Sequence, residues 1–302
     1  MNILDTTLCH IVSQLTYKWI PIGDEWESTS TDVLHTIPWL EWRRYIRCEQ
    51  NRGTPWGQVL HKHLDGAYDV VLKELEILMT SIKQGYHYLS ICDPRYPYLL
   101  RQIKDAPFGL SYRGNLDALH NPCLAIVGSR KAAVDAVREA QDLAMRLAYE
   151  GATIVSGGAI GCDTAAHLGA LCSGVRPSPT IAVMAGSIDK LYPRCNDVLF
   201  HRILEYGGMI ISERLTGTQP RPMDFPIRNR IISGIANRVL LMQAANRSGA
   251  MSTANLALAQ GRDVMVYEPR RTDVRFTGNQ ALMEQGAPWF SSADDYFQLK
   301  WE

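Results

Sequence analysis

The sequence predicts a doubly wound α/β fold with a mostly parallel sheet, preceded by a small helical domain. From residue 122 onward, short apolar runs alternate with stretches of helical spacing. Continuous apolar runs are typical of parallel strands that are buried on both faces. Residues 1–118 lack this alternation and show helical spacing instead. We therefore expect an N-terminal helical domain with a bridge over 1–118 and a Rossmann-like domain over 119–302.

The first domain is predicted from apolar spacing. Apolar side chains between residues 70 and 82 recur at helical intervals, and residues 36–47 read as another helix with Pro38 in its first turn. Five of the seven tryptophans also lie before residue 118. The run Asp93-Pro94-Arg95-Tyr96-Pro97 interrupts the helical pattern. Residues 98–118 are therefore expected to form a short bridge.

The second domain is predicted as alternating strands and helices. An alanine-rich helical segment over 132–149 follows the first strand. Ligands of such sheets bind at the carboxyl ends of the strands, so the loops that follow the strands are the candidate sites. The apolar runs that we expect to be strands are 124–128, 152–156, 180–185, 209–212, 239–244 and 263–267.

Composition limits the classes of function. Lys and Arg total 31 and so do Asp and Glu, which leaves a nucleic-acid site only as a local basic patch. The seven cysteines are odd in number and form no C-x-x-C pair, so we expect reduced cytosolic thiols and neither a disulfide framework nor a metal site. We see no signal peptide and no apolar stretch of about 18 residues. A cytoplasmic protein is expected.

Two loops that follow predicted strands have the composition of phosphate-binding turns. In Gly128-Ser129-Arg130 the hydroxyl, the free N–H groups of the next helix and the guanidinium can all bind an anion, although Ser129 could simply cap that helix. In the second turn, Gly157 and Gly158 let backbone amides approach a ligand closely. The turns lack G-x-G-x-x-G, so no dinucleotide cofactor is predicted.

The most informative stretch is Phe225-Pro226-Ile227-Arg228-Asn229-Arg230, at the expected start of a helix. Three polar donors beside an aromatic ring suit a site where phosphates are gripped while the ring stacks on a base. The alternative is structural, because Arg228 or Arg230 could hold Glu213 or Asp224 in a buried ion pair.

Two more loops offer polar groups at the same edge of the sheet. After the third strand, Lys190 and Arg194 are interleaved with Tyr192, and we expect Arg194 to be exposed and Tyr192 and Asn196 to be structural. After the fifth strand, Ser248-Gly249 could hold another phosphate or pin the Arg228 loop.

Asp163 and His167 lie four residues apart, on one face of a predicted helix. A catalytic pair needs a nucleophile or a metal nearby, and the sequence offers neither. In the structural alternative, Asp163 caps or pairs locally and His167 packs against the sheet, and we favour this alternative for His167. We expect no catalytic residue.

Taken in order, these motifs resemble the DNA processing protein A family (DprA, also called Smf). The resemblance covers about residues 120–295, and Asp93 to Leu100 with Arg113-Gly114 looks like the family's lead-in. The matching residues are Gly128-Ser129-Arg130, Ser156-Gly157-Gly158-Ala159, Asp163, His167, Asp189, Tyr192-Pro193, Asn196, Ser212-Glu213, Phe225-Pro226, Arg228-Asn229-Arg230-Ile231-Ile232-Ser233-Gly234, Ser248-Gly249, Thr253-Ala254, Gly278-Asn279 and Gly286-Ala287.

The resemblance implies an extended Rossmann-like domain that binds and protects incoming single-stranded DNA, forms a homodimer and loads the RecA recombinase in natural transformation. It implies no cofactor and no metal. The chain departs from the family at Gln243, where a glutamate is usual, and at Glu268-Pro269-Arg270, where Val-Pro-Gly is usual. The DNA-binding residues expected in this chain are Gly128, Ser129, Arg130, Gly157, Gly158, Lys190, Arg194, Phe225, Arg228, Asn229, Arg230, Ser248 and Gly249.

Two other classes of function stay open at this point. One is a nucleotide-processing enzyme that is similar to the phosphoribohydrolases on a related fold, although their Pro-Gly-Gly-x-Gly-Thr-x-x-Glu motif is absent here. The other is a Rossmann-like scaffold that acts through protein contacts alone. Base release from nucleoside monophosphates, measured beside oligonucleotide binding, separates the first from a DNA-binding protein.

Overall fold

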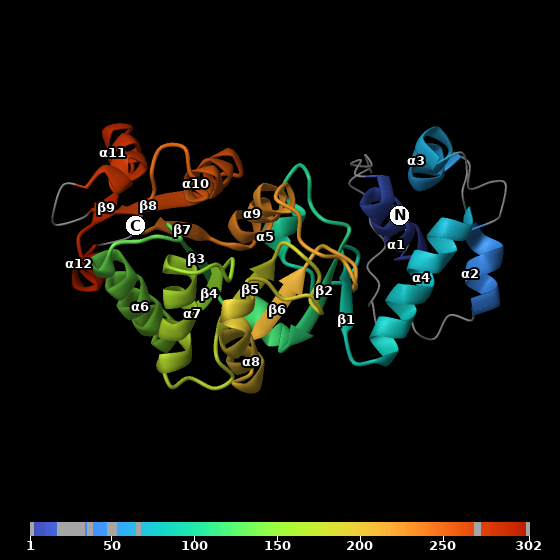
Figure 1. The fold of residues 1–302 in the computed structure, drawn as a ribbon, viewed down its shortest axis with the longest axis horizontal. Coiled ribbons are helices and arrows are strands. Elements are labelled where there is room, and N and C mark those ends of the chain that lie inside the picture. Colours follow the sequence, from blue (N-terminus) through green and yellow to red (C-terminus); the bar gives the residue numbers. More distant parts are fainter. Residues whose placement is uncertain are drawn as a thin grey trace.

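A nine-stranded sheet runs through the molecule, in the order β1-β2-β6-β5-β4-β3-β7-β8-β9 (Figure 1). The computed structural model describes residues 3–16, 34, 39–46, 53–64, 68–268 and 273–299. Strands β3 to β9 pair in parallel, and the chain builds outward from β3 in both directions. The predicted doubly wound, mostly parallel α/β fold is confirmed.

The central strands coincide with the apolar runs of the sequence. Every residue of β4, β5 and β6 is buried, as expected for strands that are covered on both faces. The parallel strands are β3 (Cys123–Val127), β4 (Thr153–Ser156), β5 (Thr180–Met184), β6 (Met209–Ser212), β7 (Arg238–Leu241), β8 (Asp263–Tyr267) and β9 (Trp289–Phe290).

Three strands were missed by the sequence analysis: β9, at one edge of the sheet, and two strands at the other edge. β1 (His87–Ser90) and β2 (Gly109–Gly114) extend the sheet beyond β6 as an antiparallel edge. Gly114 has φ +96°, and a Cβ there would lie 2.0 Å from the Gly208 carbonyl oxygen, so this pairing requires glycine. The expected bridge thus contains β2, with α5 (Tyr98–Arg101) and the 3-10 turn η3 (Leu116–Leu119) on either side.

Helices cover both faces of the sheet (Figure 1). Apolar side chains of α6 and α7 pack with Ile126 and Ile154 on one face, and those of α9 and α10 pack with Val155 and Val239 on the other. The helices of this part are α6 (Val134–Tyr149), α7 (Cys162–Cys172), α8 (Asp197–Glu205), α9 (Asp224–Ile235), α10 (Gly249–Ala259), α11 (Thr277–Glu284) and α12 (Ala293–Gln298), with the 3-10 turns η4 (Arg194–Asn196) and η5 (Val274–Phe276).

The N-terminal part is helical, as predicted. Its buried tryptophans Trp42 and Trp56 share an apolar cluster with Phe108 and Leu215, which belong to the loops beside the sheet. The helices are α1 (Ile3–Thr16), α2 (Trp39–Ile46), α3 (Pro55–Leu64) and α4 (Tyr68–Lys83). Pro38, which we expected in the first turn of α2, lies outside the described residues.

His10 of α1 ties this part to the sheet. Its Nδ1 lies 2.8 Å from the Tyr88 hydroxyl and its Nε2 lies 2.8 Å from the Glu213 carbonyl oxygen. The carbonyl can only accept, so Nε2 carries the proton and Nδ1 accepts from Tyr88. Burial lowers the pKa of His10, which the nearby Glu213 charge opposes. The ring is therefore neutral in the folded protein.

This buried neutral histidine predicts acid sensitivity. The unfolded chain binds a proton below pH 6.5 that folded His10 resists, so the free energy of unfolding should fall as the pH drops below 6.5. The slope from one such group is at most about 1.4 kcal/mol per pH unit. Urea unfolding at pH 7, 6 and 5 measures it in the wild type and in His10→Leu. A variant with the same pH slope as the wild type would contradict a neutral His10 ring.

Candidate nucleic-acid interface

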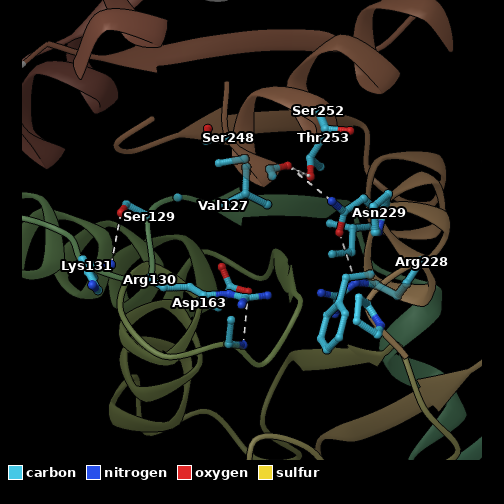
Figure 2. Close-up of a pocket in the computed structure, with 18 of the residues that line it drawn as sticks. Val127, Ser129, Arg130, Lys131, Asp163, Arg228, Asn229, Ser248, Ser252 and Thr253 are labelled. Atoms are coloured by element: carbon cyan, nitrogen blue, oxygen red, sulfur yellow. Dashed lines mark hydrogen bonds between the residues drawn. The ribbon is translucent and has the colours of Figure 1, made fainter. Parts of the chain in front are cut away.

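A cleft of about 740 Å³ opens at the carboxyl edge of the sheet (Figure 2). It lies where the chain order reverses, between β3 and β7, which is where ligands of doubly wound folds bind. Its walls are the loop after β3 and the starts of α9 and α10. It is lined by Val127, Gly128, Ser129, Arg130, Lys131, Ala159, Asp163, Tyr192, Pro222, Phe225, Pro226, Arg228, Asn229, Ile232, Ser248, Gly249, Ala250, Ser252 and Thr253.

The loop after β3 forms one wall. Gly128 is tightly placed, because a Cβ there would lie 2.5 Å from Cys162 Sγ. The Ser129 hydroxyl accepts a hydrogen bond from the backbone N–H of Lys131 at 3.1 Å, so it closes the turn and does not cap α6, which begins at Val134. Arg130 and Lys131 are exposed, and no hydrogen bond or ion pair of the described residues engages either side chain.

One N–H group at the start of α6 is already used within the protein. The backbone N–H of Ala133 donates to Gln243 Oε1 at 2.6 Å. Gln243 is one of the positions where the sequence departs from the motifs that it otherwise resembles, and its side chain holds the end of the loop after β3. Arg130 and Lys131 are the charged groups that this wall offers to an anion.

Three side chains form a row across the opening. The Arg130 guanidinium carbon lies 5.3 Å from the centre of the Phe225 ring, and Phe225 meets Tyr192 edge to face, with ring centres 5.8 Å apart. Tyr192 is 47% exposed. A cation over one aromatic ring and a second, accessible ring beside it are the groups that stack on unpaired bases. Tyr192, expected to be structural, thus also faces the cleft.

Arg228 and Arg230, both expected to bind DNA, are buried. Arg228 is 7% exposed, and its Nη1 donates to the Gly157 carbonyl at 2.6 Å and to the Val183 carbonyl. Burial lowers the pKa of Arg228 to about 10, a shift that the nearby Asp163 opposes. Arg228 borders the cleft, but its head group ties α9 to the ends of β4 and β5.

Arg230 takes the alternative role that the sequence analysis raised. It is 8% exposed, its Nη2 donates to Glu213 Oε1 at 2.7 Å, and its Nε lies 3.0 Å from Asp105 Oδ2. Burial would raise the pKa of Glu213, but the charge and hydrogen bond of Arg230 outweigh it and lower that pKa. Arg230 does not line the cleft.

The second glycine turn serves the fold. A Cβ on Gly157 would lie 2.6 Å from the Arg228 guanidinium, and one on Gly158, where φ is +70°, would lie 2.8 Å from Phe200. Asn196 donates to the Gly158 carbonyl at 2.9 Å, which confirms its structural role. Gly157 and Gly158 are buried and do not line the cleft, so they make room for neighbouring side chains.

His167 is buried in the fold, as favoured, and Asp163 lines the cleft while it forms a local hydrogen bond. Asp163 accepts the Ala159 N–H at 3.2 Å, and burial raises the pKa of its carboxyl. His167 lies 2.8 Å from the Thr180 hydroxyl, and burial together with the Arg228 charge lowers its pKa to about 3.

The loop after β5 lies beside the cleft. Arg194 is exposed, as expected, and Lys190 Nζ lies 3.9 Å from Asp189 Oδ2. Neither lines the cleft.

The start of α10 closes the cleft on its other side. Ser248 caps the helix by accepting the Met251 N–H at 3.2 Å, and Asn229 donates to the Gly249 carbonyl at 3.3 Å. The bond from Asn229 links α9 to α10. The sequence analysis raised this role as one alternative, in which Ser248-Gly249 holds the Arg228 segment in place. Ser252 and Thr253, not predicted as site residues, line the cleft one turn further along the helix.

Within the described ranges, no group of three or more His, Cys, Asp or Glu side chains is arranged to hold a metal. No helix in the same ranges is long and apolar enough to cross a membrane.

The fold and the cleft define a class: a Rossmann-like protein with a cationic, aromatic cleft at the switch point of its sheet. The family model of the DNA recombination-mediator protein A matches residues 87–300. The chain belongs to this family.

Individual members of the family are similar to this chain over most of its length. The chain is 38% identical to DNA processing protein DprA of Streptococcus pneumoniae over 70% of its own length and 73% of that protein. It is 37% identical to protein Smf of Borreliella burgdorferi and 38% identical to protein Smf of Escherichia coli, with 63% and 57% of those proteins covered. The chain thus spans less than two thirds of the last two.

Solved structures of the family share the architecture. The crystal structure of DprA from Streptococcus pneumoniae aligns over 100% of both chains with a TM-score of 0.72 and 28% identity. A structure of DNA processing protein A from Helicobacter pylori, described for its single-stranded DNA binding mode, covers 70% of this chain and 93% of that one, with a TM-score of 0.61 and 30% identity.

The different surroundings of the arginines predict different effects on stability. Arg230→Ala leaves Glu213 without its ion-pair partner, and Arg228→Ala removes a charged donor from two buried carbonyls, so each should lower the free energy of unfolding by about 3–5 kcal/mol. Arg130→Ala changes an exposed side chain and should stay within about 0.5 kcal/mol. Urea unfolding of the three variants measures this. Equal stability of all three would contradict the assigned roles.

Proposed function

We propose that the chain binds single-stranded DNA in the cleft and acts as a recombination mediator. The observation that carries the proposal is the row Arg130, Phe225 and Tyr192 across the opening, with Arg130 and Lys131 free of carboxylate partners. Unpaired cations attract a polyanion, and accessible rings stack on bases that are not held in a duplex. The description of the Helicobacter pylori relative supports the same ligand.

The proposal divides the predicted DNA-binding residues into two groups. Arg130 and Phe225 contact the strand, with Ser129, Asn229 and the Ser248-Gly249 turn bordering it. Arg228 and Arg230 position the helix that carries Phe225. Gly128, Gly157 and Gly158 shape the backbone, while Lys190 and Arg194 approach phosphates only where the strand runs past Tyr192.

The mediator role rests on the family. A protein that coats incoming single strands can protect them and load the RecA recombinase, in natural transformation or other recombination, and we place this role in the cytoplasm. The role needs no chemistry on the DNA. Asp163 is the one carboxylate among the cleft's lining residues, and it is buried and held by Ala159, which favours binding over phosphoribohydrolase-like catalysis.

Binding of labelled oligo-dT tests the function. The wild type should bind oligo-dT more tightly than a duplex of the same length, and its affinity should fall steeply with salt. Arg130→Ala should lose roughly 5- to 150-fold in affinity, the equivalent of about 1–3 kcal/mol for one charged phosphate contact. Its melting temperature should not change. If the wild type binds the duplex as tightly as the single strand, the proposal is wrong.

A homodimer is also proposed, built from the α/β part. Leu258 of α10 is 50% exposed and Trp289 of β9 is 48% exposed, and both lie toward the β8–β9 end of the sheet, where apolar surface is available for a second copy. Light scattering should give about twice the chain mass of 33.9 kDa at micromolar concentrations, and Leu258→Glu should reduce it. A monomer mass for the wild type at every concentration would rule the dimer out.

A further inference from the structure

A second hollow of about 600 Å³ lies on the far side of the start of α10. It shares four residues with the cleft: Pro226, Ser248, Gly249 and Ser252. The two hollows are thus continuous across the first turn of the helix. The remaining residues that line the second hollow are Asn246, Arg247, Met251, Asn255 and Leu256.

The second hollow is cationic and carries no acidic side chain. Arg247 is exposed, and none of the hydrogen bonds or ion pairs formed by the described residues involves its side chain. Arg214, Arg228 and Arg230, in contrast, are buried and bound by carboxylates or carbonyls. An arginine that stabilises nothing in the fold, in a hollow without carboxylates, is available for an anionic ligand.

The amides beside Arg247 point to the same ligand. Asn246 and Asn255 are exposed, and no described residue forms a hydrogen bond with either side-chain amide. The Ser248 hydroxyl, by comparison, is already used by the Met251 N–H. Arginine together with free amide groups suits a nucleotide, whose phosphate takes the cation and whose base and sugar offer donors and acceptors.

We propose that single-stranded DNA leaves the cleft over the first turn of α10 and continues into the second hollow, where Arg247 binds a further backbone phosphate. This subsite rests on the proposed function, since it extends the same strand. It lengthens the contacted stretch of DNA beyond the nucleotides that the cleft holds. Arg247 therefore contributes to the affinity for long strands and not to the affinity for strands that fill the cleft alone.

The test compares oligo-dT lengths from about 4 to about 20 nucleotides, a span that brackets the usual site sizes of single-strand-binding proteins. Affinities are measured at several salt concentrations for the wild type, Arg130→Ala, Arg247→Ala and Arg202→Ala. Arg202 is the matched control, an exposed arginine of α8 that lines neither hollow. Arg247→Ala should lose about 5- to 10-fold for the longest strand and less than twofold for the shortest, and its salt slope should drop by about one for the long strand alone. Arg202→Ala should match the wild type throughout.

The outcomes separate the subsite from the function. If Arg130→Ala weakens binding and Arg247→Ala matches the wild type at every length, the subsite is wrong and the proposed function stands. If Arg247→Ala weakens the shortest strand as much as the longest, Arg247 belongs to the first cleft and the separate subsite is again wrong. If the wild type binds no oligonucleotide, the proposed function fails and the subsite fails with it.

Discussion

Two buried guanidiniums beneath the start of α9 hold the cleft in shape. Arg228 binds carbonyls at the ends of β4 and β5, and Arg230 binds Glu213 just after β6. One helix is thereby fixed to the carboxyl ends of three successive strands. Because these bonds are buried and charge-assisted, they are costly to break. The helix consequently presents Phe225 at a set position between Arg130 and Tyr192, before any ligand is present.

The N-terminal helices reinforce this arrangement from the other side. His10 accepts from Tyr88 and donates to the Glu213 carbonyl, while Arg214 binds both Gln14 of α1 and Asp224 at the first position of α9. The segment just after β6 is therefore held between α1 and α9. A displacement of α1 can reach Phe225 through Arg214 and Asp224. The helical part therefore has a structural connection to the cleft.

The sequence predicted most strands of the sheet, but it did not predict in which direction the arginine side chains of α9 point. Apolar runs identify buried parallel strands, but β1 and β2 are antiparallel strands of mixed composition and β9 has only two residues, so no period reveals them. The arginines show the second difficulty. Residues in a helix are rotated by about 100° each, so Arg228 and Arg230 point away from each other and cannot both face one cleft. The sequence alone does not say which partner, Glu213 or a phosphate, each arginine meets.

The difference between buried and exposed arginines bears on function through the charge that each presents to a ligand. The chain is formally neutral, so no overall field attracts DNA, and a local field needs cations that the fold leaves unpaired. The buried arginines contribute little to such a field, because carboxylates and carbonyls inside the protein bind their guanidinium groups. These arginines are Arg214, Arg228 and Arg230. Three exposed cations, Arg130 and Lys131 at the cleft and Arg247 just before α10, border adjoining hollows. A neutral protein can in this way present cations along one edge of its sheet. The buried arginines hold α9, and with it Phe225, in place beside them.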